Sequence, residues 1–295
     1  MHPRDAYFLF IKRIHNKEIL AKLCMRWYNY DEAGEFFMKK FILYSNLDKD
    51  PNSQIAGKVK EALFKLGAEV TEDVTIAEAM IVLGGDGTLL HSIHSIKDIP
   101  VFGINLGTLG FLTEFDAGDL SFLEKIVNDE YIIEKRMMLE GRIAGGEPFY
   151  ALNDIVLSRG GAARVMNIKI LVDGCSADTY RADGIIAATP TGSTAYSLSA
   201  GGPIIEPDMK LIEITPICPH MMHSRSLIIS PEKSVKIILE KKDGAYLNVS
   251  ADGIGISEIT GGVAVDICAS SKTVDFIRLK DRQFFDVLNK KQELR

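Results

Sequence analysis

Cysteine and tryptophan are scarce in this chain, and closely spaced cysteine pairs are absent. The 295 residues contain one tryptophan, six histidines and four cysteines, namely Cys24, Cys175, Cys218 and Cys268. The cysteines form neither a zinc-type pair nor a disulfide framework, and the histidines show no metal-binding spacing. We therefore expect buried free thiols in a reducing cytoplasm and no metal ligands among the protein's side chains.

The sequence also lacks a long basic run and a long apolar run. Its formal net charge is -6, which argues against nucleic acid or an anionic membrane as a partner. No apolar run approaches the roughly 20 residues that span a bilayer, and the N-terminus lacks the pattern of a signal peptide. With 46% hydrophobic and 25% charged residues, the chain has the composition of a globular protein large enough for two domains. We expect a cytoplasmic location.

A glycine-rich turn with one carboxylate follows an apolar strand and reads Gly84-Gly85-Asp86-Gly87-Thr88. Glycines leave room for a phosphate and free backbone N–H groups to face an anion, and the predicted helix that follows turns its positive end toward the same place. The spacing matches neither the dinucleotide fingerprint nor the phosphate loop that ends in lysine. The turn therefore predicts phosphate binding by Gly84, Gly85 and Thr88, with Asp86 as a base for a hydroxyl group. The alternative is a tight connection in which Asp86 only caps the helix.

Strands and helices alternate in the first part of the chain. Apolar runs predict strands at 41–44, 80–83 and 100–104, and helical spacing predicts helices at 55–66, where Gly67 ends the helix, and 89–96. Such alternation indicates a mostly parallel sheet covered by helices, with ligands beyond the carboxyl ends of the strands. Both glycine-rich turns, at 84–88 and 105–111, fall there. Phe111 in the second turn is either an aromatic pocket wall or a core residue.

A β-rich region follows a predicted helix at 119–127. Short β-rich runs separated by turn residues predict antiparallel strands at 131–143, 149–157, 165–172, 226–229, 235–240, 245–249, 263–269 and 273–279. A helical stripe at 284–288 is expected to pack back on the first domain. We thus divide the chain into an N-terminal extension of uncertain status at 1–38, an α/β domain at 39–115 and a β-rich domain at 116–295. The extension is either upstream sequence before a natural start at Met38 or an amphipathic segment packed on the body or a partner.

A second constellation lies at residues 180–203, where small and hydroxyl side chains crowd together. Small residues let a flat ligand approach the backbone, while Thr194 and Ser199 can bond a base edge and Tyr196 can stack on a ring. A short helix capped by Thr191 or Ser193 is the alternative, and both can hold. Adjacent amide and carboxylate groups at Asn153-Asp154, and the acid of Asp252-Gly253, can hold ribose hydroxyls or simply form turns.

These motifs resemble those of bacterial NAD kinases in order and approximate spacing, over about residues 40–290. The first motif is shared with diacylglycerol-type lipid kinases and is similar to one in phosphofructokinases. The second, Thr189-Pro190-Thr191-Gly192-Ser193-Thr194-Ala195-Tyr196, is far more specific. The resemblance implies the two-domain NAD kinase fold and phosphoryl transfer from ATP, or another phosphate donor, to the 2′-hydroxyl of the adenosine ribose of NAD. It also implies a divalent cation such as Mg²⁺ with ATP, and a homo-oligomer, dimeric or tetrameric, in which a neighbour completes the pocket.

The resemblance also implies residue roles. Asp86 would be the catalytic base, and the substrate-binding residues would be Gly87, Asn153, Asp154, Asp183, Thr194, Ala195, Tyr196 and Ser199, with Arg164, Arg181 and Thr191 assigned by position alone. Two residues depart from the family pattern, which often has glutamate at Asp154 and glutamine at Ile254. A lipid or sugar kinase with the same glycine turn, or a non-catalytic NAD or nucleotide sensor, is the alternative function.

Overall fold

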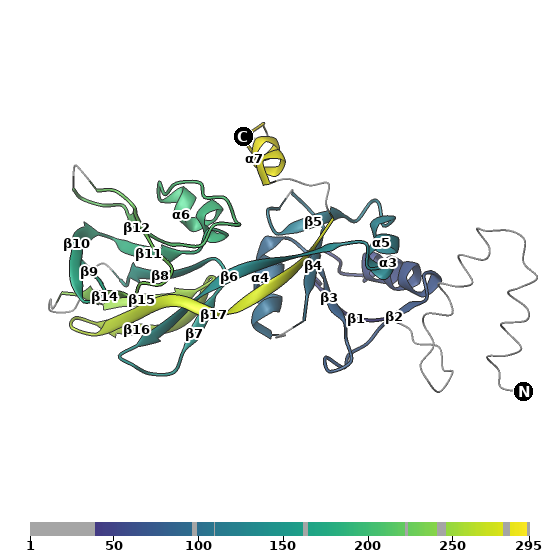
Figure 1. The fold of residues 1–295 in the computed structure, drawn as a ribbon, viewed down its shortest axis with the longest axis horizontal. Helices are drawn as coiled ribbons and strands as arrows, with labels where there is room; N and C mark the ends of the chain where they lie inside the picture. Colours follow the sequence, from purple (N-terminus) through teal and green to yellow (C-terminus); the bar gives the residue numbers. More distant parts are fainter. Residues whose placement is uncertain are drawn as a thin grey trace, which may run out of the picture.

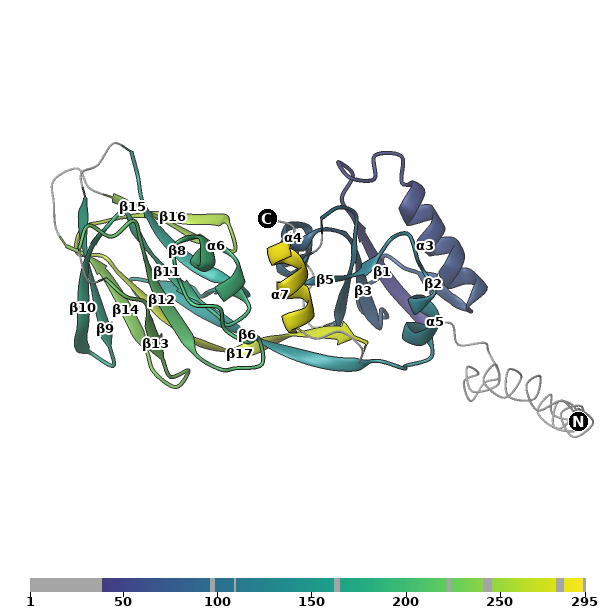
Figure 2. The same ribbon diagram turned by 90° about the horizontal axis from the view of Figure 1, so that it is seen from above.

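The computed structural model describes residues 39–95, 99–108, 110–161, 165–221, 224–240, 246–279 and 284–293. It consists of an α/β half and a β-rich half, which are joined by two long neighbouring strands (Figures 1 and 2). These are β6 (Ile132–Ile143) and β17 (Ala264–Arg278). The two expectations for residues 1–38 fall outside the described residues.

The α/β half contains the predicted parallel sheet. Its strands are β1 (Lys39–Ser45), β2 (Ala68–Val70), β3 (Ala79–Gly84), β4 (Val101–Asn105) and β5 (Thr113–Asp116), and its helices are α3 (Gln54–Lys65), α4 (Asp86–Ser95) and α5 (Phe122–Val127). The strands pair in parallel in the order β2-β1-β3-β4, with β5 beside β4. The three predicted strands are confirmed, whereas β2 and β5 were not predicted because they are short and carry few apolar residues.

The helices cover opposite faces of this sheet because the strand side chains alternate. On one face, Val59 and Leu63 of α3 pack with Ile81 and Leu83 of β3, together with α5. On the other face, Leu89 and Ile93 of α4 pack with Met80 and Val82 and also with Met138 and Phe276 of the joining strands. Helix α4 is therefore the helix that contacts the β-rich half. It begins at Asp86, earlier than the predicted residue 89, so that the acid lies in its first turn, where a negative charge favours the helix dipole.

The β-rich half is antiparallel, as predicted, and its strands form two packed sheets. One is a six-stranded sheet of order β13-β12-β11-β8-β15-β16, and the other continues through β17 into the parallel sheet. The strands are β7 (Phe149–Ala151), β8 (Asp154–Arg159), β9 (Met166–Val172), β10 (Cys175–Ala182), β11 (Gly184–Ala188), β12 (Ile212–Ile217), β13 (Leu227–Ile229), β14 (Val235–Leu239), β15 (Tyr246–Ala251) and β16 (Ile254–Thr260). The paired strands of the six-stranded sheet are antiparallel throughout.

Three details differ from the predicted strands. The run at 149–157 is two strands with a turn at residues 152–153, and the runs at 263–269 and 273–279 are one strand with a bulge. Strands β10, β11, β12 and β16 were not predicted. Of these, β11 is buried on both faces in the middle of its sheet, and such strands lack the alternation that marks a half-exposed strand.

The division of the chain at residues 115 and 116 stays a prediction. Helix α5 belongs to the core of the α/β half, and β6 and β17 run through both halves. Helix α7 (Phe284–Glu293) follows β17 and contacts the α/β half, where the Phe284 ring lies 5.9 Å from that of Phe111. Within the described ranges, no helix combines the length and apolar character needed to cross a bilayer.

Candidate active site

The Asp86 carboxylate holds the segment that leads into β5. It accepts hydrogen bonds from the backbone N–H groups of Phe111 (2.7 Å), Leu112 (3.0 Å) and Thr113 (3.0 Å), and from the Thr113 hydroxyl (3.1 Å). A carboxylate has about four lone-pair positions, two on each oxygen. Oδ1 accepts three of these bonds and Oδ2 only the one from Phe111, so Oδ2 keeps a position for another donor. A Cβ on Gly110 would lie 2.1 Å from Asp86 Oδ1, so the segment can approach the acid only with glycine there.

The glycine turn opens onto a cavity lined by a lysine from another loop. A Cβ on Gly87 would meet nothing within 4 Å, and one on Gly85 would meet only Lys49 Nζ, at 3.1 Å. Gly85, Gly87, Thr88, Lys49 and Lys291 line this cavity of about 440 Å³ together with Asp86. Space above the backbone, a helix N-terminus and a cation suit a phosphate group.

Asn46 connects the lysine loop to the glycine turn. Its Nδ2 donates to Thr88 Oγ1 at 3.0 Å, and its Oδ1 accepts from the backbone N–H of Lys49 at 3.3 Å. Asp50, the residue after Lys49 in the same loop, accepts from the N–H groups of Ile55 and Ala56 at the start of α3. These bonds lower the pKa of Asp50, with the bond from Ala56 the largest cause, and they fix the loop that carries Lys49.

The small-residue segment packs directly on the turn at residues 152–153. The N–H of Thr189 donates to the carbonyl of Asn153 at 2.9 Å, and the Thr189 hydroxyl donates to the carbonyl of Leu152 at 2.6 Å. Gly192 lies so close that a Cβ there would stand 2.0 Å from the Asn153 carbonyl oxygen. A 3₁₀ turn (Gly192–Thr194) and α6 (Tyr196–Ser199) follow. The expected short helix is present, but neither Thr191 nor Ser193 caps it by a side-chain bond.

Asp252 fixes the same turn from the other side. It forms a two-residue hairpin turn with Gly253, and both residues have positive φ, 50° and 80°. Its carboxylate accepts from the N–H groups of Leu152 (2.8 Å), Asn153 (2.7 Å) and Asp154 (3.2 Å). The turn-forming interpretation of Asp252-Gly253 is therefore confirmed, and ribose binding by Asp252 stays a prediction.

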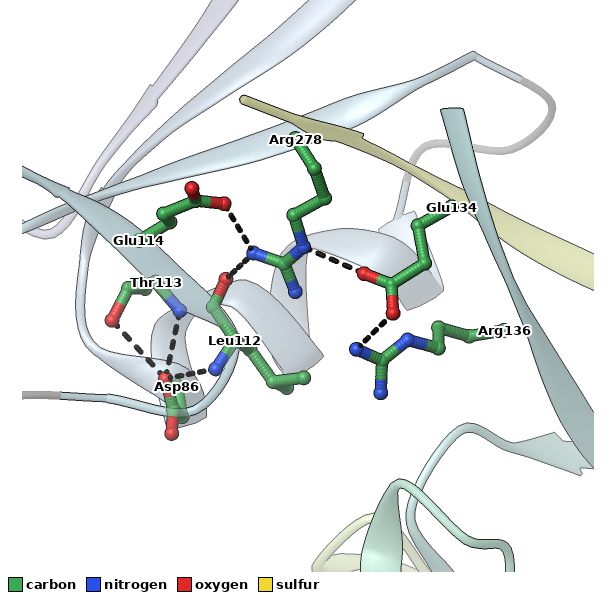
Figure 3. Close-up of polar contacts among 7 residues, drawn as sticks. All are labelled: Asp86, Leu112, Thr113, Glu114, Glu134, Arg136 and Arg278. Atoms are coloured by element: carbon green, nitrogen blue, oxygen red, sulfur yellow. Dashed lines mark hydrogen bonds and ion pairs between the residues drawn. The ribbon is translucent and has the colours of Figure 1, made fainter. Parts of the chain in front are cut away.

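A chain of polar contacts connects the two constellations, and Figure 3 shows the part of it from Asp86 to Arg136. Arg278 donates to the carbonyl of Leu112 at 3.1 Å and contacts Glu134, whose other oxygen lies 2.6 Å from Arg136. Arg136 in turn donates to Thr191 Oγ1 at 3.1 Å. Because Leu112 also bonds to Asp86, the contacts run from the glycine turn to the small-residue segment.

The charges in this chain balance each other. Burial raises the pKa of Glu134, but the guanidinium groups of Arg136 and Arg278 outweigh burial and leave that pKa below its usual value. Glu114 lies 3.2 Å from Arg278 and supplies a second carboxylate. Buried ions are tolerated only when paired in this way. A cavity of about 310 Å³ lies over the network, lined by Phe111 and Leu112 on one side and by Thr191 and Thr194 on the other.

Asn153 and Asp154 present unsatisfied polar atoms. Asn153 Oδ1 is buried with no hydrogen-bond partner. Asp154 is only 5% exposed, and among the described residues no group donates a hydrogen bond to its carboxylate. Burial, and secondarily the nearby charge of Asp252, raises the pKa of Asp154 from 3.8 to about 7.

The remaining predicted residues are placed as follows. Thr194 lines the cavity, Ala195 separates the 3₁₀ turn from α6, and the side chains of Tyr196 and Ser199 are exposed. Arg181 and Asp183 lie at the opposite end of β11 from Thr189, about 20 Å away along the strand. They therefore do not reach the cavity of their own chain. Asp183 instead pairs with Arg159 at 3.2 Å. Arg164 lies outside the described residues.

Several site residues were missed from the sequence, namely Lys49, His94, Glu134, Arg136 and Arg278. Arg136 and Arg278 lie in strands that carry several other charged residues, so nothing in the sequence marked these two arginines as buried. Lys49 carried no signal, because nothing local shows that its loop folds over the glycine turn.

The raised pKa of Asp154 makes the stability pH-dependent. The folded state binds this proton more tightly than the unfolded state, so stability falls as the pH rises from about 4 to about 7. At pH 8 the free energy of unfolding of Asp154→Asn should therefore exceed that of wild type by about 1 to 4 kcal/mol, since one pKa unit corresponds to roughly 1.4 kcal/mol. Near pH 4 the two proteins should be equally stable. Urea denaturation at both pH values measures this, with the exposed Glu147→Gln as control. An equal difference at both pH values would contradict the buried, raised pKa.

Comparisons with known proteins show the family of this chain. The family models of the ATP-NAD kinase N-terminal and C-terminal domains match residues 34–131 and 152–279. The NAD kinase of Caldanaerobacter subterraneus subsp. tengcongensis is 39% identical over 280 residues, covering 86% of this chain and 99% of that protein. The crystal structure of an Archaeoglobus fulgidus NAD kinase in complex with ATP has a TM-score of 0.73 at 28% identity, covering 86% of this chain and 99% of that one. The crystal structure of yeast NADH kinase complexed with NADH has a TM-score of 0.75, and the match covers 87% of this chain and 88% of that one. At 23% identity this likeness shows the shared fold alone.

The match to both family models and the identity over most of the chain lead to one conclusion: this chain belongs to the ATP-NAD kinase family.

Proposed function

We propose that this chain transfers the γ-phosphoryl group of ATP to the 2′-hydroxyl of the adenosine ribose of NAD and so forms NADP. The observation that carries this proposal is the chain of polar contacts from Asp86 to Thr191, which connects the phosphate-type turn beside one cavity to the nucleotide-type segment beside another. The family membership disfavours a lipid or sugar kinase. A sensor without turnover is separated from an enzyme by the assay below.

The reaction needs mainly alignment and charge neutralisation. The ribose oxygen attacks the γ-phosphorus, the bond from that phosphorus to the β–γ bridging oxygen breaks, and ADP leaves. The hydroxyl proton passes to Asp86. Oδ2 of Asp86 accepts only the N–H of Phe111, so this oxygen can also accept the ribose hydroxyl. The three backbone donors then keep the carboxylate in place.

The donor phosphates lie in the cavity lined by Gly85, Gly87 and Thr88 in this proposal. Gly84 does not line it, because the Thr88 side chain lies where a Cβ of Gly84 would be. The open space above Gly87 and the Lys49 ammonium beside Gly85 support it. The described residues contain no cluster of three acidic, histidine or cysteine side chains suited to a metal. A divalent cation such as Mg²⁺ therefore fits best as a companion of the ATP phosphates, near Asp86, where it neutralises phosphate charge.

Asn153 and Asp154 bind ribose hydroxyls of NAD in this proposal, and Thr191, Thr194, Ala195, Tyr196 and Ser199 contact the nucleotide. The unpartnered Asn153 Oδ1 and the Asp154 carboxylate support the first assignment, because both are acceptors that await donors.

We further propose a cytoplasmic homo-oligomer in which Arg181 and Asp183 serve the site of a neighbouring subunit. Their distance from the cavity of their own chain supports this, and a monomeric mass in solution scattering would contradict it.

Cys175 and Cys218 are free and exposed, contrary to the expected burial, and exposed thiols persist in a reducing compartment. Recovery of the protein from a secreted fraction would contradict the location.

Purified protein incubated with NAD, ATP and Mg²⁺ should form NADP. An enzymatic assay specific for NADP measures the product, and omission of ATP is the control. NAD binding without NADP would instead identify a sensor, and neither binding nor product would reopen the question of the substrate.

Asp86→Asn should lower kcat by about 10²- to 10⁴-fold, the usual contribution of a general base. The amide also loses one acceptor for the backbone donors of residues 111–113, so some loss of stability is expected. Thr113→Val is the matched control, since it removes only the hydroxyl donor, and its kcat should stay within about threefold of wild type. Near-wild-type turnover by Asp86→Asn would remove the base assignment.

Lys49→Ala should raise the KM for ATP by about three- to tenfold, as expected for one exposed contact to phosphate, and leave the KM for NAD unchanged. The effect should shrink at high ionic strength because salt screens an exposed ammonium. Lys58→Ala, on the exposed side of α3, is the control for lost surface charge. Equal changes in the KM values for ATP and NAD would contradict a donor-side position.

A further inference from the structure

Helix α4 reaches both parts of the site. Its first residue, Asp86, holds the segment at residues 111–113, and His94, eight residues later, lies about 12 Å further along the helix axis. The helix stands at the side of the α/β half that faces the β-rich half (Figures 1 and 2). It is therefore placed to set the distance between the two halves of the site.

His94 contacts the β-rich half through Asp252. Nε2 of His94 lies 2.9 Å from Asp252 Oδ2, and the two side chains are 24% and 1% exposed. Because that oxygen also accepts from the N–H of Leu152, the imidazole is the donor in this contact. The carboxylate thus holds α4 and the turn at residues 152–154 at once.

We propose that His94 is a positioning residue for NAD binding, because its hydrogen bond to Asp252 fixes helix α4 relative to the turn that carries Asn153 and Asp154. The inference rests on the proposed function, in which this turn holds a ribose of NAD. Loss of the bond releases the turn from the helix that carries Asp86, so NAD no longer meets both at the required separation. The lysine and glycine side of the ATP site is unaffected, because α3 and the Asn46 loop hold it.

The surroundings of His94 make substitutions feasible. Its side chain borders a cavity of about 700 Å³ whose apolar lining includes Ile93, Met138 and Ile254. A side chain of similar length can therefore enter without a clash.

The test compares two substitutions of His94 whose side chains have the same length and nearly the same shape. His94→Gln keeps an N–H donor near the position of Nε2, whereas His94→Glu offers an acceptor that Asp252 repels. The Kd and KM for NAD should rise about tenfold or more in His94→Glu and stay within about threefold of wild type in His94→Gln. The KM for ATP should stay within about twofold in both. His91→Gln, an exposed position on the same helix, is the control.

Calorimetry gives the Kd for NAD and initial rates give the KM values. Equal NAD affinity in the Gln and Glu variants would overturn the role of His94, and so would an equal loss of NAD and ATP affinity. If thermal denaturation shows that His94→Glu does not fold, His94→Leu, which fits the apolar lining and donates nothing, replaces it in the comparison. Wild-type protein that neither binds NAD nor forms NADP would overturn the proposed function itself, and this inference with it.

Discussion

Two carboxylates that accept backbone N–H groups determine the geometry of this site. Asp86 accepts from three consecutive N–H groups at residues 111–113, and Asp252 accepts from three consecutive N–H groups at residues 152–154. Hydrogen bonds to an ionised group are among the stronger ones in proteins, and three of them leave a segment little freedom. Each acid comes from a glycine-containing turn that follows a strand, so rigid elements position both acids. The loops that would contact substrates are therefore ordered by groups from distant parts of the chain.

The joining strands β6 and β17 link the segment held by Asp86 to the small-residue segment of the β-rich half. Glu134 and Arg136 lie on β6 and Arg278 on β17, so the charged chain between Leu112 and Thr191 runs along the strands that connect the halves. Removing one member would leave a buried charge unpaired, which typically costs about 3 to 5 kcal/mol. Rotation of one half against the other would break several contacts together. The arrangement thus favours a single relative position of the two motifs, which phosphoryl transfer requires because it depends chiefly on alignment.

The sequence indicated the parts of the site that depend on local chemistry. Glycine at 84, 85 and 87, the helical spacing of Leu89 and Ile93, and the apolar strands are legible without a structure because backbone freedom and burial act over a few residues. The parts that depend on register were not legible. Strand β11 was missed within the small-residue segment because a strand buried on both faces lacks the alternation of apolar and polar residues. Lys49 and His94 contact their partners only after distant parts of the chain have folded together. The bonds of Asp86 to residues 111–113 likewise depend on the packing of β4 beside β5.

Asp154 illustrates how the fold leaves one interaction for the ligand to complete. The backbone N–H of Asp154 bonds to Asp252, yet its own carboxylate is buried near that second acid without a donor, which is why its pKa is raised to about 7. An unpaired buried charge destabilises the free protein, and strained or unsatisfied groups of this kind concentrate at functional sites. Two ribose hydroxyls would supply the missing donors and stabilise the ionised form. Binding would then lower the pKa of Asp154 and remove the unfavourable burial of an unpaired carboxylate. Part of the affinity for NAD would come from this gain in stability.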